Sequence, residues 1–284
     1  MTIRQAGEEL LAKLISIYEQ REAVAITDLV MENITGSGKI DRIINKNILL
    51  SPPAIDMLNK YTSELLNHTP VQYVLHEAWF AGMKFYVDER VLIPRPETEE
   101  LVNWAITEIK NKQAVLLDIG TGSGCIPITL KKKLPQLNIV ACDISEGALE
   151  VANRNAIAHK VDIKFSQIDF LDANNRNTLP PLGYIISNPP YIPLHDKISL
   201  DKNVVDHEPH LALFVDNENP LIFYEAIADF ASKKLLAKGK IFAEMHEALS
   251  ADINQLFLSK GFTDIEIRKD MYGKNRLIKA TMLL

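Results

Sequence analysis

The first part of the chain, residues 1–75, carries apolar side chains at helical spacing. Leu10, Leu14 and Tyr18 recur at intervals of four within the stretch 6–23, so this stretch is predicted to form a helix. Apolar positions at similar spacing continue beyond it with few glycines, which favours several short helices packed as a bundle. We therefore predict a small helical domain here.

Turn and capping residues predict where the later helices of this domain begin and end. Thr27 is a candidate cap for a helix that closes near Gly36. Ser51 precedes two prolines, which are favoured in the first turn of a helix, and that helix is predicted to end before Pro70.

The pattern changes after the helical domain. Aromatic and β-branched side chains alternate on both sides of Ala81-Gly82, which predicts a β-hairpin linker over residues 76–93. A helix is predicted next, over residues 95–110, because Pro96 stands at its start and glutamates follow in the first turn.

From Ala114 onwards, apolar runs typical of strands alternate with amphipathic helical stretches. The predicted strands are 114–120, 138–144, 162–168, 184–191, 240–246, 263–270 and 276–284. The predicted helices are 125–133, 145–160, 220–239 and 248–261. Strands separated by helices favour a mostly parallel sheet with helices on both faces. We therefore predict an α/β domain with a Rossmann-like, seven-stranded sheet over residues 94–284.

Composition and charge restrict the class of protein. The chain has 284 residues and a net charge of −6, so it lacks the positive bias of proteins that bind nucleic acid through phosphates. Its two cysteines give no disulfide framework and no zinc-ligand spacing, so we expect no metal. The longest uncharged stretch, residues 177–195, contains five prolines and is not a membrane span. The N-terminus has no signal-peptide pattern, and we expect a cytoplasmic protein.

A glycine-rich loop follows the first strand of the predicted sheet and opens a helix. Gly120, Gly122 and Gly124 alternate with other residues, and their missing β-carbons let a ligand lie against the backbone. The dinucleotide fingerprint requires glycine where Cys125 stands, so that fingerprint fails. The pattern, preceded by Asp118 on the strand, resembles instead the S-adenosylmethionine (SAM) loop of class I methyltransferases.

Acidic and aromatic residues follow the next two predicted strands. Asp143 ends the second strand, where an acidic side chain can accept hydrogen bonds from both ribose hydroxyls of a nucleoside. Asp169 and Phe170 follow the third strand, where they can contact the amino group and the ring of an adenine. Nucleoside binding is thus indicated at Asp118, Gly120, Gly122, Gly124, Asp143, Asp169 and Phe170.

The fourth strand leads directly into Asn188-Pro189-Pro190-Tyr191. Neither proline nitrogen can donate a hydrogen bond, so the polar groups here, including the asparagine side-chain oxygen, are acceptors. With Tyr191 as a flat face, this loop could hold a planar NH2 group and aim its nitrogen at a methyl donor. Such a combination resembles amino-group methyltransferases that carry (Asn/Asp)-Pro-Pro-(Tyr/Phe).

Nearly the whole chain resembles one family, the HemK/PrmC family of glutamine-N5 methyltransferases of peptide chain release factors. The matching stretches are PVQYVLHEAWFAGMKFYV, VLIPRPETEELV, LDIGTGSGCI, ISNPPYIP, HEPHLAL and KDMYGKNR. The resemblance implies a substrate, the glutamine of the Gly-Gly-Gln motif of class I release factors, and an N-terminal helical domain that helps to bind it. It also implies SAM contacts along the glycine loop, including Thr121 and Ser123, and at Asn188. The implied glutamine site is Asn188, Pro189, Pro190 and Tyr191.

Other functions remain open at this stage. A glutamine methyltransferase of a ribosomal protein would need the same two motifs. A DNA or RNA amino (adenine N6) methyltransferase would need a basic recognition segment, which we do not find. A nucleotide-dependent oxidoreductase is disfavoured by the failed fingerprint, and a simple nucleoside-binding module would not need the Asn-Pro-Pro-Tyr loop.

Three residues near the expected site have no assigned role. Glu244 and His246 follow the fifth strand, where the family is expected to have an acidic residue and then a small turn. The segment from Arg95 to Thr98 either belongs to a well-capped helix start or lines the rim of the pocket. The histidines of the stretch 207–210 have no third metal ligand nearby in the sequence, so we expect a structured loop there.

Overall fold

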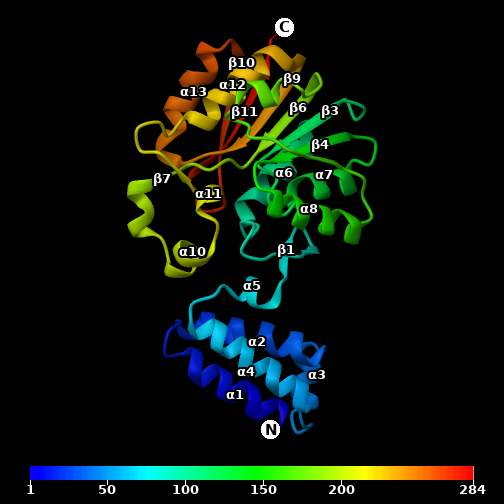
Figure 1. The fold of residues 1–284 in the computed structure, drawn as a ribbon, viewed down its shortest axis with the longest axis vertical. Coiled ribbons are helices and arrows are strands. Elements are labelled where there is room, and N and C mark those ends of the chain that lie inside the picture. Colours follow the sequence, from blue (N-terminus) through cyan, green and yellow to red (C-terminus); the bar gives the residue numbers. More distant parts are fainter. Residues whose placement is uncertain (284) are drawn as a thin grey trace. The chain divides into compact units, whose positions relative to one another are not determined.

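The computed structural model describes residues 1–283, which fall into two compact units (Figure 1). One unit consists of Met1–Glu77 together with the short segment Asp201–His207. The other unit consists of Ala78–Leu200 and the chain from Glu208 onwards.

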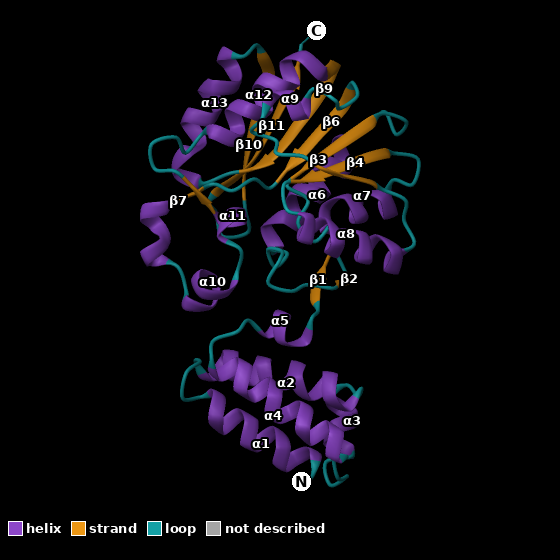
Figure 2. Ribbon diagram, viewed as in Figure 1, coloured by secondary structure: helices purple, strands orange, loops and turns teal. Residues whose placement is uncertain are grey.

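The first unit is entirely helical apart from its connections (Figure 2). Its helices are α1 (Ile3–Leu14), α2 (Gln20–Thr35), α3 (Lys39–Ile44), α4 (Pro52–Leu66), α5 (Val71–Leu75) and α10 (Lys202–His207). Leu10, Leu14, Val30 and Leu65 are buried together in its core. The ring of His207 joins the segment 201–207 to this unit, because its Nε2 lies 3.1 Å from the carbonyl oxygen of Asn67.

The predicted limits of the first two helices are wrong. Helix α1 ends at Leu14 and α2 begins at Gln20, so the predicted helix 6–23 falls on two helices. Thr27 does not cap a helix; it lies in the middle of α2, where its hydroxyl donates to the carbonyl of Ala23 at 2.7 Å. A threonine inside a helix can satisfy its hydroxyl in this way. Burial of the apolar face of α2 stabilises the helix on both sides of Thr27, so the helix continues past it.

The other predicted ends in this unit are confirmed. Gly36 terminates α2 in the left-handed conformation, with φ 64°. The Ser51 hydroxyl caps α4 by accepting a hydrogen bond from the backbone N–H of Ala54. Pro70 follows the end of α4 as expected.

The second unit begins with the predicted hairpin and continues as an α/β domain. Its strands are β1 (Ala78–Phe80), β2 (Met83–Phe85), β3 (Val115–Ile119), β4 (Asn138–Asp143), β5 (Lys164–Gln167), β6 (Leu182–Ser187), β7 (Ile192–Pro193), β8 (Phe214–Val215), β9 (Leu235–Glu244), β10 (Phe262–Lys269) and β11 (Asn275–Met282). Its helices are α6 (Pro96–Glu108), α7 (Cys125–Lys133), α8 (Glu146–His159), α9 (Ala173–Arg176), α11 (His210–Leu213), α12 (Ile222–Lys234) and α13 (Ser250–Ser259), with 3-10 turns η1 (Leu194–Ser199) and η2 (Glu247–Leu249). The final predicted strand extends to Leu284, which lies outside the described residues.

Seven strands form the central sheet in the order β10-β11-β9-β6-β3-β4-β5. All neighbours pair in parallel except β11, which is antiparallel to both β9 and β10. The prediction of a mostly parallel seven-stranded sheet is therefore confirmed. Strand order reverses at β3, so the carboxyl ends of β3, β4 and β6 meet at the position where open α/β sheets bind ligands.

Alternate residues of each strand face two different apolar cores, and helices cover both faces of the sheet (Figure 2). Leu117, Ile185 and Ile241 face the core formed with α12 and α13. Their neighbours Leu116, Ile186 and Phe242 face the core formed with α6, α7 and the hairpin. Burial on both faces explains why these strands appear in the sequence as continuous apolar runs.

Two predictions in this unit are wrong. The helix predicted for 220–239 ends at Lys234, because Leu235 already pairs with Leu182 of β6 and begins strand β9. Pairing to the central sheet prevails there over the helical propensity of the sequence. The strand predicted for 184–191 ends at Ser187, because the prolines that follow cannot donate to a sheet.

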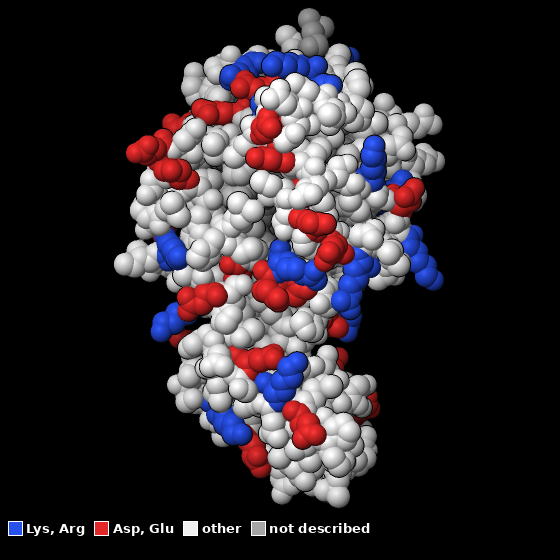
Figure 3. Space-filling model, in the orientation of Figure 1, with Lys and Arg blue, Asp and Glu red and all other residues white. Residues whose placement is uncertain are grey.

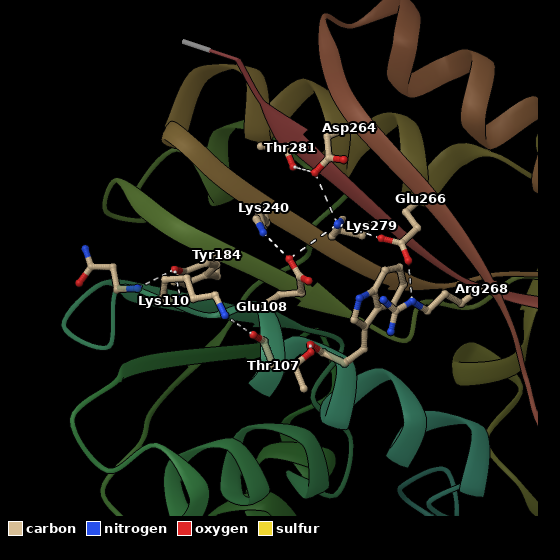
Figure 4. Close-up of polar contacts among 12 residues, drawn as sticks. Thr107, Glu108, Lys110, Tyr184, Lys240, Asp264, Glu266, Arg268, Lys279 and Thr281 are labelled. Carbon is tan, nitrogen blue, oxygen red and sulfur yellow. Dashed lines mark hydrogen bonds and ion pairs between the residues drawn. The ribbon is translucent and has the colours of Figure 1, made fainter.

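Charged side chains join α6 to the outer strands of the sheet (Figure 4). Lys279 of β11 is 4% exposed and faces three carboxylates, with its Nζ 3.0 Å from Glu266, 3.5 Å from Asp264 and 3.6 Å from Glu108. Glu108 also pairs with Lys240 of β9. The cluster therefore links the end of α6 with β9, β10 and β11.

Candidate active site

The glycine loop connects β3 to α7 at the carboxyl edge of the sheet. Gly120, Gly122 and Gly124 have φ of 72°, 52° and 79°, a region that other residues rarely adopt. A β-carbon at Gly124 would also lie 3.3 Å from the Cα of Ala152, so glycine lets α8 approach the start of α7. A β-carbon at Gly122 would meet no atom within 4 Å, so the loop leaves open space beside its backbone.

Asn155 of α8 supports this loop from behind. Its side-chain amide donates to the carbonyls of Ser123 and Tyr86, both at 2.9 Å, and its Oδ1 accepts from the backbone N–H of Tyr86 at 2.7 Å. One buried asparagine thus fixes the glycine loop to the chain that follows the hairpin. No sequence pattern marks Asn155, because it is a single polar position within a helix.

Three buried polar side chains under the loop have hydrogen-bonding atoms without a partner among residues 1–283. They are the carboxylate of Asp118 and the hydroxyls of Thr121 and Ser123. Burial raises the pKa of Asp118 to about 7. Buried polar atoms are normally satisfied, and Thr121 and Ser123 line the cavity, so their hydroxyls fit a ligand that supplies the missing hydrogen bonds. Asp118 is fully buried and does not line the cavity, and the Thr121 side chain opposes the rise of its pKa.

The carboxylate of Asp143 projects beside the loop from the end of β4. Its Oδ2 accepts from the backbone N–H of Gly122 at 2.9 Å, and its Oδ1 accepts from that of Ser145 at 3.0 Å. Burial raises the pKa of this carboxyl. Each oxygen has a further lone pair, so the side chain can also accept from vicinal hydroxyls.

Asp169 and Phe170 lie on the same cavity as the glycine loop, after β5. The Oδ1 of Asp169 accepts from the backbone N–H of Leu171 at 2.9 Å. Phe170 is 4% exposed and packs edge-on against Phe230 of α12, with the ring centroids 5.3 Å apart. The aromatic ring is therefore held rigidly at the wall of the cavity.

The Asn-Pro-Pro-Tyr loop leaves the sheet at the end of β6. Asn188, Pro189 and Pro190 line the cavity that the glycine loop, Asp143 and Phe170 also line. Tyr191 lines a neighbouring cavity, and its hydroxyl donates to Glu244 Oε1 at 2.8 Å. The structure therefore brings most of the predicted cofactor residues and the asparagine together around one cavity, and it places the tyrosine on the neighbouring one. Asp118 and Gly124 are not among the residues that line the first cavity.

Two functional candidates had no assigned role in the sequence, Thr98 and Glu244. Thr98 of α6 donates to Glu244 Oε2 at 2.7 Å and accepts from Asn188 Nδ2 at 3.1 Å. Burial raises the pKa of the Glu244 carboxyl. The sequence signal for Glu244 is an acidic residue directly after an apolar strand. Thr98 has a weaker signal, because the segment that contains it is also typical of a helix start.

Arg95 and Glu208 join two segments at the rim of the cavity. Arg95 pairs with the carboxylate of Glu208, whose other oxygen accepts from the backbone N–H of Ile93 at 3.2 Å. The stretch 207–210 is therefore structured around a buried acid. His246 caps η2 by accepting from the backbone N–H of Ala248, and burial lowers the pKa of its ring. No group of three potential metal-binding side chains occurs within residues 1–283.

Comparison with known proteins identifies the family. The methyltransferase small domain family matches residues 101–208. The chain is 36% identical to the release factor glutamine methyltransferase of Flavobacterium psychrophilum, and the alignment covers 99% of both. It is 37% identical to that of Bacteroides thetaiotaomicron, over 94% of this chain and 95% of the relative. The chain belongs to the release factor glutamine methyltransferase family.

Solved structures agree with this membership at the level of the fold. A methyltransferase from Pyrococcus furiosus has a TM-score of 0.54 at 15% identity, over 78% of this chain and 98% of that one. The predicted class I methyltransferase fold is thereby confirmed. The resemblance to the release factor glutamine methyltransferase family is confirmed by the relatives above. Within the described part of the chain, no helix is long and apolar enough to cross a membrane.

Proposed function

We propose that this protein is a SAM-dependent protein-(glutamine-N5) methyltransferase of class I peptide chain release factors. It would transfer a methyl group to the side-chain amide of the glutamine in their Gly-Gly-Gln motif, in the cytoplasm, and so modulate translation termination. The observation that carries the proposal is the similarity, over 99% of both chains, to a protein named release factor glutamine methyltransferase.

The cofactor site is proposed from the groups that remain for a ligand. Asp143 would accept from ribose hydroxyls, and Phe170 with Asp169 would hold the adenine. The hydroxyls of Thr121 and Ser123 would face the rest of the SAM molecule, with the backbone of Gly120 and Gly122 beside it. Asp118 and Gly124 would support the shape of the loop, since they do not line the cavity. SAM, when bound, supplies an electrophilic methyl group on a sulfonium.

The chemistry of the protein side chains suits an amide substrate. An amide nitrogen is a poor nucleophile because its lone pair is delocalised, which also causes a rotation barrier of about 18–20 kcal/mol. The Asn188 side-chain oxygen and the backbone carbonyl of this loop can accept the two N–H bonds of the amide. One such preplaced group can contribute about 2.7–4 kcal/mol in a transition state. Orientation of the nitrogen can contribute about 7–11 kcal/mol more.

The first unit is proposed to help bind the release factor. On the face of this unit that Figure 3 shows, acidic and basic side chains are interspersed and no extended basic patch is visible. A substrate recognised through its phosphates would favour a strong positive bias, and the chain has a net charge of −6. These observations favour a protein substrate over DNA or RNA, and we expect no direct binding of nucleic acid.

The test is a parallel assay with methyl-tritiated SAM. Purified release factor, ribosomal proteins and DNA are each incubated with the protein, and mass spectrometry locates the label. We expect label on the glutamine of the Gly-Gly-Gln motif, and none on a release factor with that glutamine replaced. Label on a ribosomal protein or on DNA alone would refute the proposal.

A further inference from the structure

Four side chains form a hydrogen-bonded chain between the two cavities of the second unit. Asn188 donates to Thr98, Thr98 donates to Glu244, and Tyr191 donates to the other oxygen of Glu244. Asn188 and Thr98 line the first cavity, whereas Glu244 and Tyr191 line the second. Thr98 is 3% exposed and Glu244 is 2% exposed, so water does not compete strongly for these bonds.

The directions of these bonds follow from counting protons. A threonine hydroxyl has one proton, and Thr98 uses it to donate a hydrogen bond to the carboxylate of Glu244. Its oxygen can then only accept from Asn188, so the NH2 side of that carboxamide must face Thr98. The Oδ1 atom is left for a ligand in the cavity. A carboxamide turned by 180° would place two acceptors, or two donors, against each other.

Glu244 itself is held in place by its surroundings. The hydroxyl of Tyr224 donates to its main-chain carbonyl at 2.9 Å, which fixes the backbone at the end of β9. Arg276 lies beside it; its guanidinium donates to the carbonyl of Met245 and pairs with Asp270, both at 3.2 Å. Burial raises the pKa of the Glu244 carboxyl, and the hydrogen bonds from Thr98 and Tyr191, together with the nearby guanidinium of Arg276, oppose that rise. Both carboxyl oxygens accept a hydrogen bond, one from Thr98 and one from Tyr191.

We propose that Glu244, acting through Thr98, is a positioning residue that sets which way the Asn188 carboxamide points. This inference rests on the proposed function, because the exposed Oδ1 is then the acceptor for an N–H of the substrate amide. With the carboxamide reversed, its NH2 would face the substrate NH2 and would repel it. The orientation of the Asn188 carboxamide within the Asn-Pro-Pro-Tyr motif therefore depends on two residues outside the motif, Thr98 and Glu244.

The experiment compares three substitutions in the full-length protein. Thr98→Val removes the hydroxyl with little change of shape, and Thr98→Ser keeps it. Thr107→Val is the matched control, because Thr107 lies on the same helix and its hydroxyl donates locally, to the carbonyl of Trp104. For each we measure kcat and KM with release factor, the Kd for SAM by calorimetry, and the Tm.

We expect Thr98→Val to lower kcat by about 10- to 100-fold, with the Kd for SAM within threefold of wild type. Thr98→Ser should restore kcat to within about fivefold, and Thr107→Val should match wild type. Glu244→Gln should also lower kcat, since a carboxamide there can accept from only one of the two hydroxyls. If Thr98→Val changes only KM or Tm, the residue has a merely structural role and the proposal fails.

A second readout needs no substrate. The side-chain amide protons of Asn188 are identified in nitrogen-15 NMR spectra by their loss in Asn188→Asp. One of them should exchange slowly in wild type and in Thr98→Ser, and quickly in Thr98→Val. If wild type shows this pattern but does not methylate release factor, the proposed function fails and the positioning role stands. Equal exchange in wild type and Thr98→Val would overturn the positioning role.

Discussion

Asp143 and Gly122, which lie 21 positions apart in the sequence, are joined by a 2.9 Å hydrogen bond from the glycine N–H to the carboxylate. This bond fixes the carboxylate at the end of β4 against the loop that follows β3. Asp143 also lines the cavity, in which we propose that the ribose of the cofactor lies.

We predict that Asp143→Ala raises the Kd for SAM by about 10- to 100-fold. A hydrogen bond to a charged group contributes about 1.5–3 kcal/mol, and the substitution also frees the glycine loop. Isothermal calorimetry measures the change. Asp56→Ala, an exposed position on α4, serves as the control and should bind SAM like wild type. An unchanged Kd for Asp143→Ala would show that the ribose lies elsewhere.

Asn188→Ala should separate catalysis from cofactor binding. The side chain offers an acceptor to the substrate amide, so its loss should lower kcat by about 100-fold or more. The Kd for SAM should stay within several-fold of wild type, because the glycine loop and Asp143 are untouched. Single-turnover kinetics and calorimetry test the two halves of this expectation. A comparable loss of SAM affinity would mean that the residue mainly serves the cofactor.

Asp118 should make the stability of the cofactor-free protein depend on pH. Its pKa is raised by burial from 3.8 to about 7 in the folded state, so folding favours the protonated acid. The free energy of unfolding therefore falls as pH rises from about 4 to about 7, by at most about 4 kcal/mol from this group.

Asp118→Asn removes that dependence, because an amide does not ionise. The variant should gain stability relative to wild type as the pH of a urea titration is raised from 5 to 8. Asp172→Asn, at an exposed cap of α9, should follow the wild-type curve. Parallel curves for wild type and Asp118→Asn would contradict the prediction.

Lys279→Met should destabilise the second unit. The ammonium is buried and faces Glu266, Asp264 and Glu108 (Figure 4), so its removal leaves like charges facing one another. Fully buried pairs lose about 3–5 kcal/mol when one partner is removed, and we expect about 2 kcal/mol because these carboxylates are partly exposed. Glu266→Gln should cost less than about 1 kcal/mol. Urea denaturation followed by circular dichroism measures the loss of stability in both variants. Equal losses would argue against this ranking.

Much of the fold could be predicted because its signals are local. The glycine loop, the apolar runs and the capping residues Ser51 and Gly36 each act within a few positions of the chain. The errors arise where distant contacts decide. Thr27 is carried inside α2 by burial of the helix face, and Leu235 joins a strand because Leu182 lies beside it. No local pattern contains that information.

The residues of the candidate site also fall into those that the sequence could predict and those that it could not. Asp143, Phe170 and Asn188 could be placed together, because carboxyl ends of parallel strands meet at one edge of a sheet. The partners of Asn188 could not, since Thr98 lies 90 positions before it in the chain and Glu244 lies 146 positions after Thr98. The packing of α6 on the sheet brings them together, and no local pattern in the sequence contains that contact.

The short segment 201–207 belongs to the helical unit, although it lies far along the chain from the other helices of that unit. The backbone therefore passes from one unit to the other more than once. Cutting the gene at the hairpin would remove the helices that α10 packs on. It would leave α10 without its partners directly before Glu208, whose carboxylate pairs with Arg95 at the cavity. Loss of activity in such a truncated enzyme would not distinguish lost substrate binding from a disturbed fold. Surface substitutions within the helical unit test more directly what that unit binds.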